Sequence, residues 1–434
     1  MKKINFLSPF QNFVKIESFS GILLFSATII ALIWANSPFA YLYESLWQYK
    51  IGFHIADFAL DKPLLLWVND GLMAIFFFLI GLEIKRELLI GELNTMRKAA
   101  LPFFAAIGGM VVPVIFFLVL NSDPKATVGW GIPMATDIAF SLAILKLLGN
   151  RVPLSLKVFL TAFAIVDDLG AVMIIGIFYS SGLNWALLAS GLGILAVFYW
   201  LAFRQIYLKY LLFIAAAVVW VLFLKAGLHP TLAGVLAAFA VPIRQKIDSA
   251  TYLGMLDQIV EAFRSSPNPS KVILSKEQLQ QLDYLEDWTE QVQSPLQNLE
   301  HKLHSVVAYF IMPVFALANT GIAFGGGSTI EQGLVITLSL SLLFGKSIGV
   351  VLFTFLGTGL KLAELPESVG KWQILGVGLL SGVGFTMAIF IATLAFDGMP
   401  EMVDSAKIGI LLGSLLSGIG GYLVLRFNSE KSLA

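Results

Sequence analysis

The sequence predicts an all-α polytopic membrane protein with about twelve transmembrane helices. Of its 434 residues, 58% are hydrophobic and only 13% are charged, and the mean hydropathy is +0.84. A bilayer core about 30 Å thick is crossed by roughly 20 apolar residues, and the chain contains many apolar runs of that length. The absence of cysteine excludes disulfides, thiolate metal sites and cysteine nucleophiles.

The placement of Lys and Arg fixes the predicted orientation. The candidate spans lie near 19–36, 64–84, 99–120, 128–148, 154–180, 183–203, 207–224, 228–243, 304–324, 333–358, 371–396 and 406–426. The two termini and the loops after the even-numbered spans hold 22 of the 28 Lys and Arg residues; the opposite loops hold five, and Lys346 falls inside a span. By the positive-inside rule, both termini are predicted to be cytoplasmic. The basic, apolar start favours an uncleaved first span over a signal peptide.

The two longest connections differ in character. Residues 245–303 are polar, and we expect a cytoplasmic loop with short amphipathic helices around SSPNPS. This divides the chain into 1–244 with spans 1–8, the loop 245–303, and 304–434 with spans 9–12 and a cytoplasmic tail. Residues 47–55, WQYKIGFHI, alternate apolar and polar, which predicts an outside strand or hairpin near 45–60 that pairs with a second chain; an interfacial aromatic segment is the alternative.

An internal repeat points to the middle of the membrane. GWGIPMATDIA (129–139) and GVGFTMAIFIA (382–392) share six identities at one offset, and they lie in spans 4 and 11, which enter from opposite sides. Each contains G-x-G with a Pro or Thr, residues that weaken helix continuity. We therefore predict inverted repeats with two discontinuous helices that cross at mid-membrane, the arrangement of a transporter binding site. Glycines for close helix packing are the alternative.

Five charges lie well inside the spans, away from their ends: Asp70, Asp137, Asp167, Asp168 and Lys346. Each costs about 2.5–3.5 kcal/mol at a span centre, so such groups persist when paired or functional. The set contains four acids and only one base. Lys346 is predicted to pair with Asp167, while Asp137 and Lys346 compensate the dipoles of the broken helices. At least one acid then needs a cation or a proton.

Asp168 is the acid that this accounting leaves without a partner. Adjacent helical residues point roughly 100° apart, so Asp167 and Asp168 cannot face the same lysine equally. A partly desolvated carboxylate can bind a proton or a hard cation but not both, and Thr136 and freed backbone carbonyls add oxygen ligands. Competition between H⁺ and a cation at one alternately exposed site is an exchange mechanism.

Seven segments of the chain resemble the NhaA-type bacterial sodium/proton antiporters. They are WVNDGLMAIFFFLIGLEIKREL, GIPMATDIAFSLAIL, AIVDDLGAVMIIGIFYS, GLHPTLAGV, LEHKLH…MPVFALANTGIAF, LFGKSIGVVLF and GVGFTMAIFIATLAF, and they cover nearly all spans. The resemblance implies that Asp167 and Asp168 bind Na⁺ and H⁺, that Asp137 and Thr136 lie where the broken helices cross, and that Lys346 compensates charge. It also implies accessory roles for Asn69 and Asp70, and a pH-sensing cytoplasmic cluster of Glu83, Arg86, Glu87, Glu300, His301 and His304.

The predicted function is therefore that of a transporter, not an enzyme. The resemblance implies electrogenic exchange of cytoplasmic Na⁺ or Li⁺ for about two external H⁺, in a homodimer joined through the outside hairpin in the bacterial inner membrane. No cofactor and no nucleic acid partner is expected. The 245–303 loop is longer than the family resemblance implies, and it ends at the cluster residues Glu300, His301 and His304. A proton- or sodium-coupled organic anion symporter of similar fold is the alternative; a cation channel would lack proton counter-movement.

Overall fold

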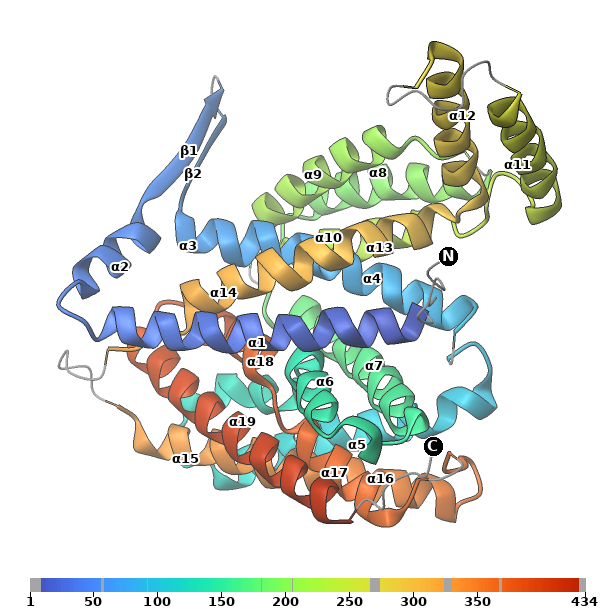
Figure 1. The fold of residues 1–434 in the computed structure, drawn as a ribbon. Helices are drawn as coiled ribbons and strands as arrows, with labels where there is room; N and C mark the ends of the chain where they lie inside the picture. The colour runs from blue at the N-terminus through green and yellow to red at the C-terminus, as the bar shows by residue number, and fades with distance from the viewer. Residues whose placement is uncertain are drawn as a thin grey trace.

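The structure is a computed structural model, and it describes residues 9–55, 58–91, 93–180, 182–204, 206–265, 274–323, 330–366 and 369–428. The side chains of residues 9–18, 53–60 and 150 lie outside this description. The described chain is a bundle of helices with one pair of strands (Figure 1).

Nine helical segments in the described residues are long and apolar enough to cross a membrane. Five are continuous: α5 (Met96–Leu120), α7 (Leu154–Phe178), α8 (Trp185–Phe203), α9 (Lys209–Ala226) and α19 (Pro400–Asn428). Four are composite: α3 (Leu64–Leu66) with η1 (Trp67–Leu72) and α4 (Met73–Leu89); α13 (Pro295–Val306) with η4 (Val307–Ile311) and α14 (Met312–Asn319); α15 (Gln332–Leu340) with η5 (Ser341–Lys346) and α16 (Ser347–Gly359); and α17 (Lys371–Ser381) with α18 (Phe385–Ala395).

Two further helix pairs qualify only if each bent pair counts as one span. They are α1 (Pro9–Ala35) with α2 (Ala40–Gln48), bent by 112°, and η2 (Ala126–Met134) with α6 (Ile138–Leu147), bent by 44°. The described residues thus offer nine to eleven crossings. The segment predicted as a span at 228–243 contains only α10 (Thr231–Phe239), whose nine residues reach roughly 13 Å and are too short for a bilayer core.

Several boundaries differ from the sequence prediction. The polar connection contains α11 (Ser249–Arg264) and α12 (Lys276–Val292), and most of the SSPNPS segment between them lies outside the described residues. The loop boundary predicted at 303 falls inside a helix, because α13 already begins at Pro295. A one-turn helix, η3 (Gly149–Arg151), follows α6.

The strand pair is antiparallel. β1 (Lys50–Ile55) pairs with β2 (Phe58–Pro63) from Lys50↔Pro63 to Ile55↔Phe58. The alternating pattern that begins at Trp47 overestimates the strand, since Trp47 lies on α2 with its side chain buried.

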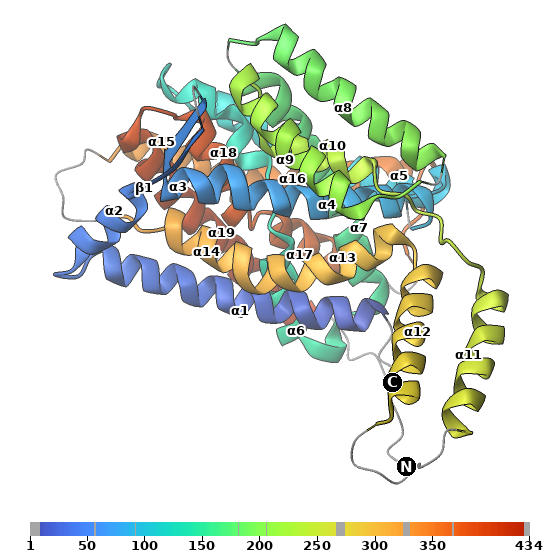
Figure 2. The ribbon, with the colours of Figure 1, turned by 90° about the horizontal axis from the view of Figure 1, so that it is seen from above.

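The two ends of the bundle carry different elements. In Figures 1 and 2 the strand pair projects at one end, whereas α11 and α12 project at the other. The start of α1 and the end of α19 lie at the α11–α12 end. We refer to these as the hairpin side and the α11–α12 side.

Close contact between α5 and α16 fixes the frame around the central helices. A Cβ at Gly108 on α5 would lie 2.1 Å from the carbonyl oxygen of Gly349 on α16, and a Cβ at Gly349 would lie 2.1 Å from that of Gly108. Only glycine permits two backbones to approach this closely. Because α5 also packs against α7 and η5, it holds together the elements that carry Asp168 and Lys346.

Candidate functional site

Two interrupted helices cross inside the bundle. Between η2 and α6, residues 135–137 are extended, and between α17 and α18 the helix breaks at residues 382–384. The Asp137 N–H donates to the carbonyl oxygen of Val383 at 2.6 Å. A Cβ at Gly384 would lie 2.8 Å from the carbonyl oxygen of Ala135, so glycine is what lets the two breaks pass each other.

Asp137 occupies the start of both half-helices that begin at the crossing. Its Oδ1 accepts from the Phe140 N–H at 3.1 Å, which caps α6. Its Oδ2 accepts from the N–H of Thr386 at 3.1 Å and from the Thr386 hydroxyl at 2.5 Å, in the first turn of α18. One buried carboxylate therefore compensates two positive helix ends.

The opposite, carbonyl-rich ends of the broken helices also have partners. The Lys346 ammonium donates to the carbonyl oxygen of Met134, the last residue of η2. The Thr136 hydroxyl donates to the Ser381 carbonyl at 3.0 Å, and the Ser141 hydroxyl donates to the Leu380 carbonyl at 3.0 Å. Side-chain donors thus satisfy three carbonyls near the broken helix ends.

Lys346 also pairs with Asp167, as the charge pattern predicts. The Lys346 Nζ lies 2.7 Å from the Asp167 Oδ2, and both side chains are fully buried. The other carboxylate oxygen of Asp167 is buried with no hydrogen-bond partner in the described residues. A buried ion pair of this kind adds little net stability to the fold, because the cost of desolvating the two charges offsets much of their Coulomb attraction.

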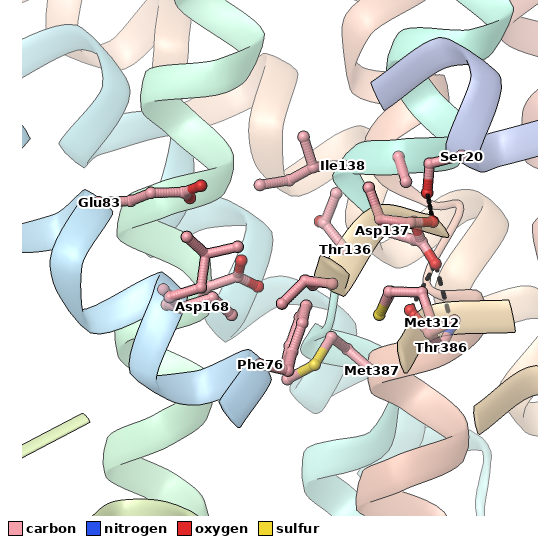
Figure 3. A pocket seen from close by; sticks show the side chains of 15 residues that line it. Ser20, Phe76, Glu83, Thr136, Asp137, Ile138, Asp168, Met312, Thr386 and Met387 are labelled. Atoms are coloured by element: carbon pink, nitrogen blue, oxygen red, sulfur yellow. Dashed lines mark hydrogen bonds between the residues drawn. The ribbon is translucent and has the colours of Figure 1, made fainter. Parts of the chain in front are cut away.

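Asp168 differs from its neighbour. It makes no hydrogen bond or ion pair with any residue of the described ranges, and its Oδ1 is buried without a partner. Its side chain lines a cavity of about 50 Å³, which is large enough for a few water molecules. Figure 3 shows Asp168 and Glu83 on one side of this cavity and Thr136 and Asp137 on the other. The cavity wall is therefore acidic, with three carboxylates.

A charged cluster lies beyond Glu83 towards the α11–α12 side. Arg86 Nε donates to both carboxylate oxygens of Glu300 at 3.0 Å, and its guanidinium lies 2.6 Å from Glu87. His304 Nδ1 lies 3.8 Å from the Glu83 carboxylate. His301 is exposed on α13 and is not part of the cluster, contrary to the predicted grouping. Glu300 and His304 are about 40° apart around the helix, whereas His301 lies about 100° from Glu300, on the exposed part of the helix.

Asp70 has a basic partner that sequence analysis missed. Lys62 on β2 lies 2.6 Å from the Asp70 carboxylate, so the tally of one base for four intramembrane acids is wrong. Asn69 forms a reciprocal amide pair with Asn319, at 2.8 and 3.1 Å. Lys62 lies only eight residues before Asp70 in the sequence. It was overlooked because it was assigned to a loop outside the spans. Asn319 and Thr386 are neutral, so a count of charges could not detect them.

Within the described residues, no three His, Asp or Glu side chains converge closely enough to hold a metal ion on their own. The sequence-predicted residues nevertheless form a connected arrangement. Asp137, Thr136, Asp167 and Lys346 meet at the crossing, and Asp168 and Glu83 face the adjoining cavity. Asn69 and Asp70 lie apart from them, on the hairpin side.

Comparison with known proteins gives one consistent result. A family model described as Na+/H+ antiporter 1 matches residues 11–425. A Na(+)/H(+) antiporter NhaA of Oleidesulfovibrio alaskensis is 49% identical over 426 residues, covering 97% of this chain and 94% of that relative. NhaA 1 of Saccharophagus degradans is 44% identical (99% and 94% covered), and NhaA of Helicobacter pylori strain J99 is 43% identical (98% and 96% covered).

Proposed function

The chain belongs to the Na+/H+ antiporter 1 family, and we propose that it exchanges cytoplasmic Na⁺ or Li⁺ for external H⁺. The resemblance drawn from the seven sequence segments is thereby confirmed at the level of the family. In this proposal Asp168 carries the transported ion, with Asp167, Asp137, Thr136 and Lys346 around it.

The observation that carries the proposal is the environment of Asp168. It is a buried carboxylate without a hydrogen-bonding partner among the residues that the structure describes, and it borders a cavity with room for water. An ionised carboxylate in such a place needs a cation or a proton, because the desolvation of a lone charge is costly. Na⁺ prefers oxygen ligands, and a partly hydrated ion would find Asp168 and water in the same small space.

Exchange follows if the two ligands exclude each other. A proton on Asp168 neutralises the group that attracts Na⁺, and Na⁺ on the carboxylate opposes protonation. If the cavity reaches the two membrane faces in turn, Na⁺ released on one side is replaced by H⁺, which is released on the other. No covalent chemistry and no cofactor is required.

We further propose an electrogenic cycle of about two H⁺ per Na⁺. Asp167 supplies the second proton site: protonation removes its negative charge and with it the Coulomb attraction to Lys346, 2.7 Å away. One net charge then moves inward per cycle, worth about 2.3 kcal/mol per 100 mV of membrane potential. The membrane potential thus helps to drive Na⁺ outward.

The remaining parts of the proposal concern the membrane setting. We assign twelve crossings in the bacterial inner membrane by counting the short helix α10 with its flanking residues as span 8. The discontinuous helices are spans 4 and 11, and both termini and α11–α12 are assigned to the cytoplasm. The Glu83, Arg86, Glu87, Glu300 and His304 cluster is assigned to pH regulation, and the strand pair to homodimerisation. The start of α1, the end of α19 and α11–α12 all lie at one end of the bundle, which supports this orientation.

The organic anion symporter is disfavoured by the cavity itself. Its volume of about 50 Å³ is too small for an organic anion. Its three carboxylates would also repel one, because like charges in a poorly solvated space interact strongly.

The test uses proteoliposomes that contain a pH-sensitive dye. We expect a sodium pulse to move protons in the parent protein and in Glu364→Gln, a matched control at an exposed carboxylate paired only with Arg97. Asp168→Asn should abolish this movement while remaining folded. Sodium-driven proton movement that survives in Asp168→Asn would overturn the assignment, and movement driven by an organic anion without sodium would favour the symporter.

A further inference from the structure

The cavity beside Asp168 is closed on the hairpin side by two layers. Phe76 on α4 and Met312 on α14 belong to the cavity wall. Seven residues further towards the hairpin, roughly 10 Å along each helix, the same two segments carry Asn69 and Asn319. The reciprocal amide pair therefore joins the two helical segments that flank the cavity.

The inner layer is aromatic. The ring of Phe390 on α18 lies 5.6 Å from that of Phe77, 6.2 Å from that of Phe315 and 5.4 Å from the His229 imidazole. The three phenylalanine side chains are fully buried. Phe315 lies between the cavity-wall residue Met312 and Asn319 on the same segment, so this aromatic cluster packs beside the cavity on the side of the amide pair.

The outer layer connects to the strand pair. Lys62 on β2 forms its ion pair with Asp70, the residue next to Asn69, and the Trp67 indole N–H donates to the Ile51 carbonyl on β1 at 2.9 Å. The Trp220 indole N–H donates to the Asp70 carbonyl at 2.9 Å. Asn69 and Asp70 lie in η1, a widened π-helical turn, and such turns are frequent at functional sites.

We propose that the Asn69–Asn319 amide pair and the Lys62–Asp70 ion pair form the hairpin-side gate of the cavity. This inference rests on the proposed exchange function, which requires the cavity to reach that side in part of the cycle. The strand pair then has a role within its own chain, because β2 positions Lys62 beside Asp70.

The chemistry of the pairs suits a contact that opens and closes. In the closed state the two amides make three hydrogen bonds, two with each other and one from Asn319 to the Phe315 carbonyl, so their burial is largely compensated. In the open state water replaces each partner, so the net difference between the two states stays small. Breaking the pair by substitution leaves one buried amide without a partner, which disfavours the closed state alone.

The absence of native cysteine allows a direct test. In a Met387→Cys background, the new thiol lies in the cavity wall on α18 and reports access from either side. A membrane-impermeant cationic thiol reagent is added to right-side-out and to inverted vesicles. Asn319→Ala and Lys62→Met are compared with Lys50→Met, a matched control on β1 whose exposed lysine has no ion pair with a described residue.

We expect Asn319→Ala and Lys62→Met to raise the labelling rate from the hairpin side about tenfold. Losing one such pair destabilises the closed state by enough to change the closed-to-open ratio by about that factor. Lys50→Met should label like the parent. Equal rates in all three variants would overturn the gate. Lys62→Met keeps the test decisive if Asn319→Ala does not fold, because Lys62 is partly exposed.

Exchange is measured in the same vesicles so that the two proposals are judged separately. Faster labelling without sodium-linked proton movement in the parent would support the gate and refute antiport. Intact antiport with unchanged labelling in Asn319→Ala and Lys62→Met would refute the gate alone.

Discussion

Replacing Asp137 tests whether one carboxylate holds the crossing together. Asp137→Ala removes three hydrogen bonds, one at the start of α6 and two at the start of α18. Each bond to a charged group contributes about 1.5–3 kcal/mol, and the loss of a helix cap alone costs about 0.5–2 kcal/mol. Because the groups left behind are buried, we expect a total loss of about 4–6 kcal/mol, close to the whole stability of many domains.

Asp137→Asn separates the two helix starts. The amide oxygen still accepts at one start, but the NH₂ group cannot accept from the Thr386 N–H, so we expect a loss of about 2–3 kcal/mol. Asp248→Ala is the matched control: Asp248 caps the exposed helix α11 through a single bond to the Thr251 N–H at 3.2 Å, and its loss should cost about 1 kcal/mol or less.

The assay is thermal unfolding of purified protein in detergent, followed by the loss of the monodisperse peak. We expect the midpoints to fall in the order parent, Asp248→Ala, Asp137→Asn, Asp137→Ala. If Asp137→Ala and Asp248→Ala unfold at the same midpoint temperature, then Asp137 does not join the two broken helices and the reasoning is wrong.

Three further outcomes follow from contacts in the structure. Lys346→Met leaves Asp167 as a buried unpaired charge, so unfolding measurements should show a loss of about 3–5 kcal/mol, much of it restored in Lys346→Met/Asp167→Asn; equal stability of the single and double variants would contradict the pairing. The pH profile of exchange in proteoliposomes should change in His304→Gln, whose ring lies beside Glu83, and should not change in exposed His301→Gln; matching profiles would exclude the cluster as the pH sensor. Gly349→Ala should cost about 1–3 kcal/mol by overpacking α5, whereas Gly359→Ala on the same helix, with open space at its Cβ, should be neutral in the same unfolding assay.

Charge and repetition were the features from which the centre of the site could be predicted. The imbalance of intramembrane charges led to the Asp167–Lys346 pair, which the structure contains. The repeat located both breaks, at residues 135–137 and 382–384, because Gly and Pro act locally on helix continuity. The Asp167–Lys346 pair joins residues 179 positions apart, but it could be predicted because so few charged residues lie deep in the spans.

What could not be predicted depends on contacts between distant segments. The amide pair of Asn69 and Asn319 joins residues 250 positions apart, and neither carries a charge that demands a partner. The salt bridge from Lys62 depends on how the strand pair folds back over η1. The alternation that begins at Trp47 is compatible with either a strand or a helix end, and tertiary packing placed Trp47 on α2.

The composite segment Pro295–Asn319 behaves as a single bar through the molecule. Its 25 residues reach roughly 37 Å, with Glu300 and His304 near one end and Asn319 at the other. The π-helical turn η4 lies at its middle, close to the cavity wall at Met312. A bar that pivots near its midpoint moves its two ends in opposite directions, so tightening one end loosens the other. In the proposed exchange cycle, such a pivot would couple closure at one face of the membrane to opening at the other.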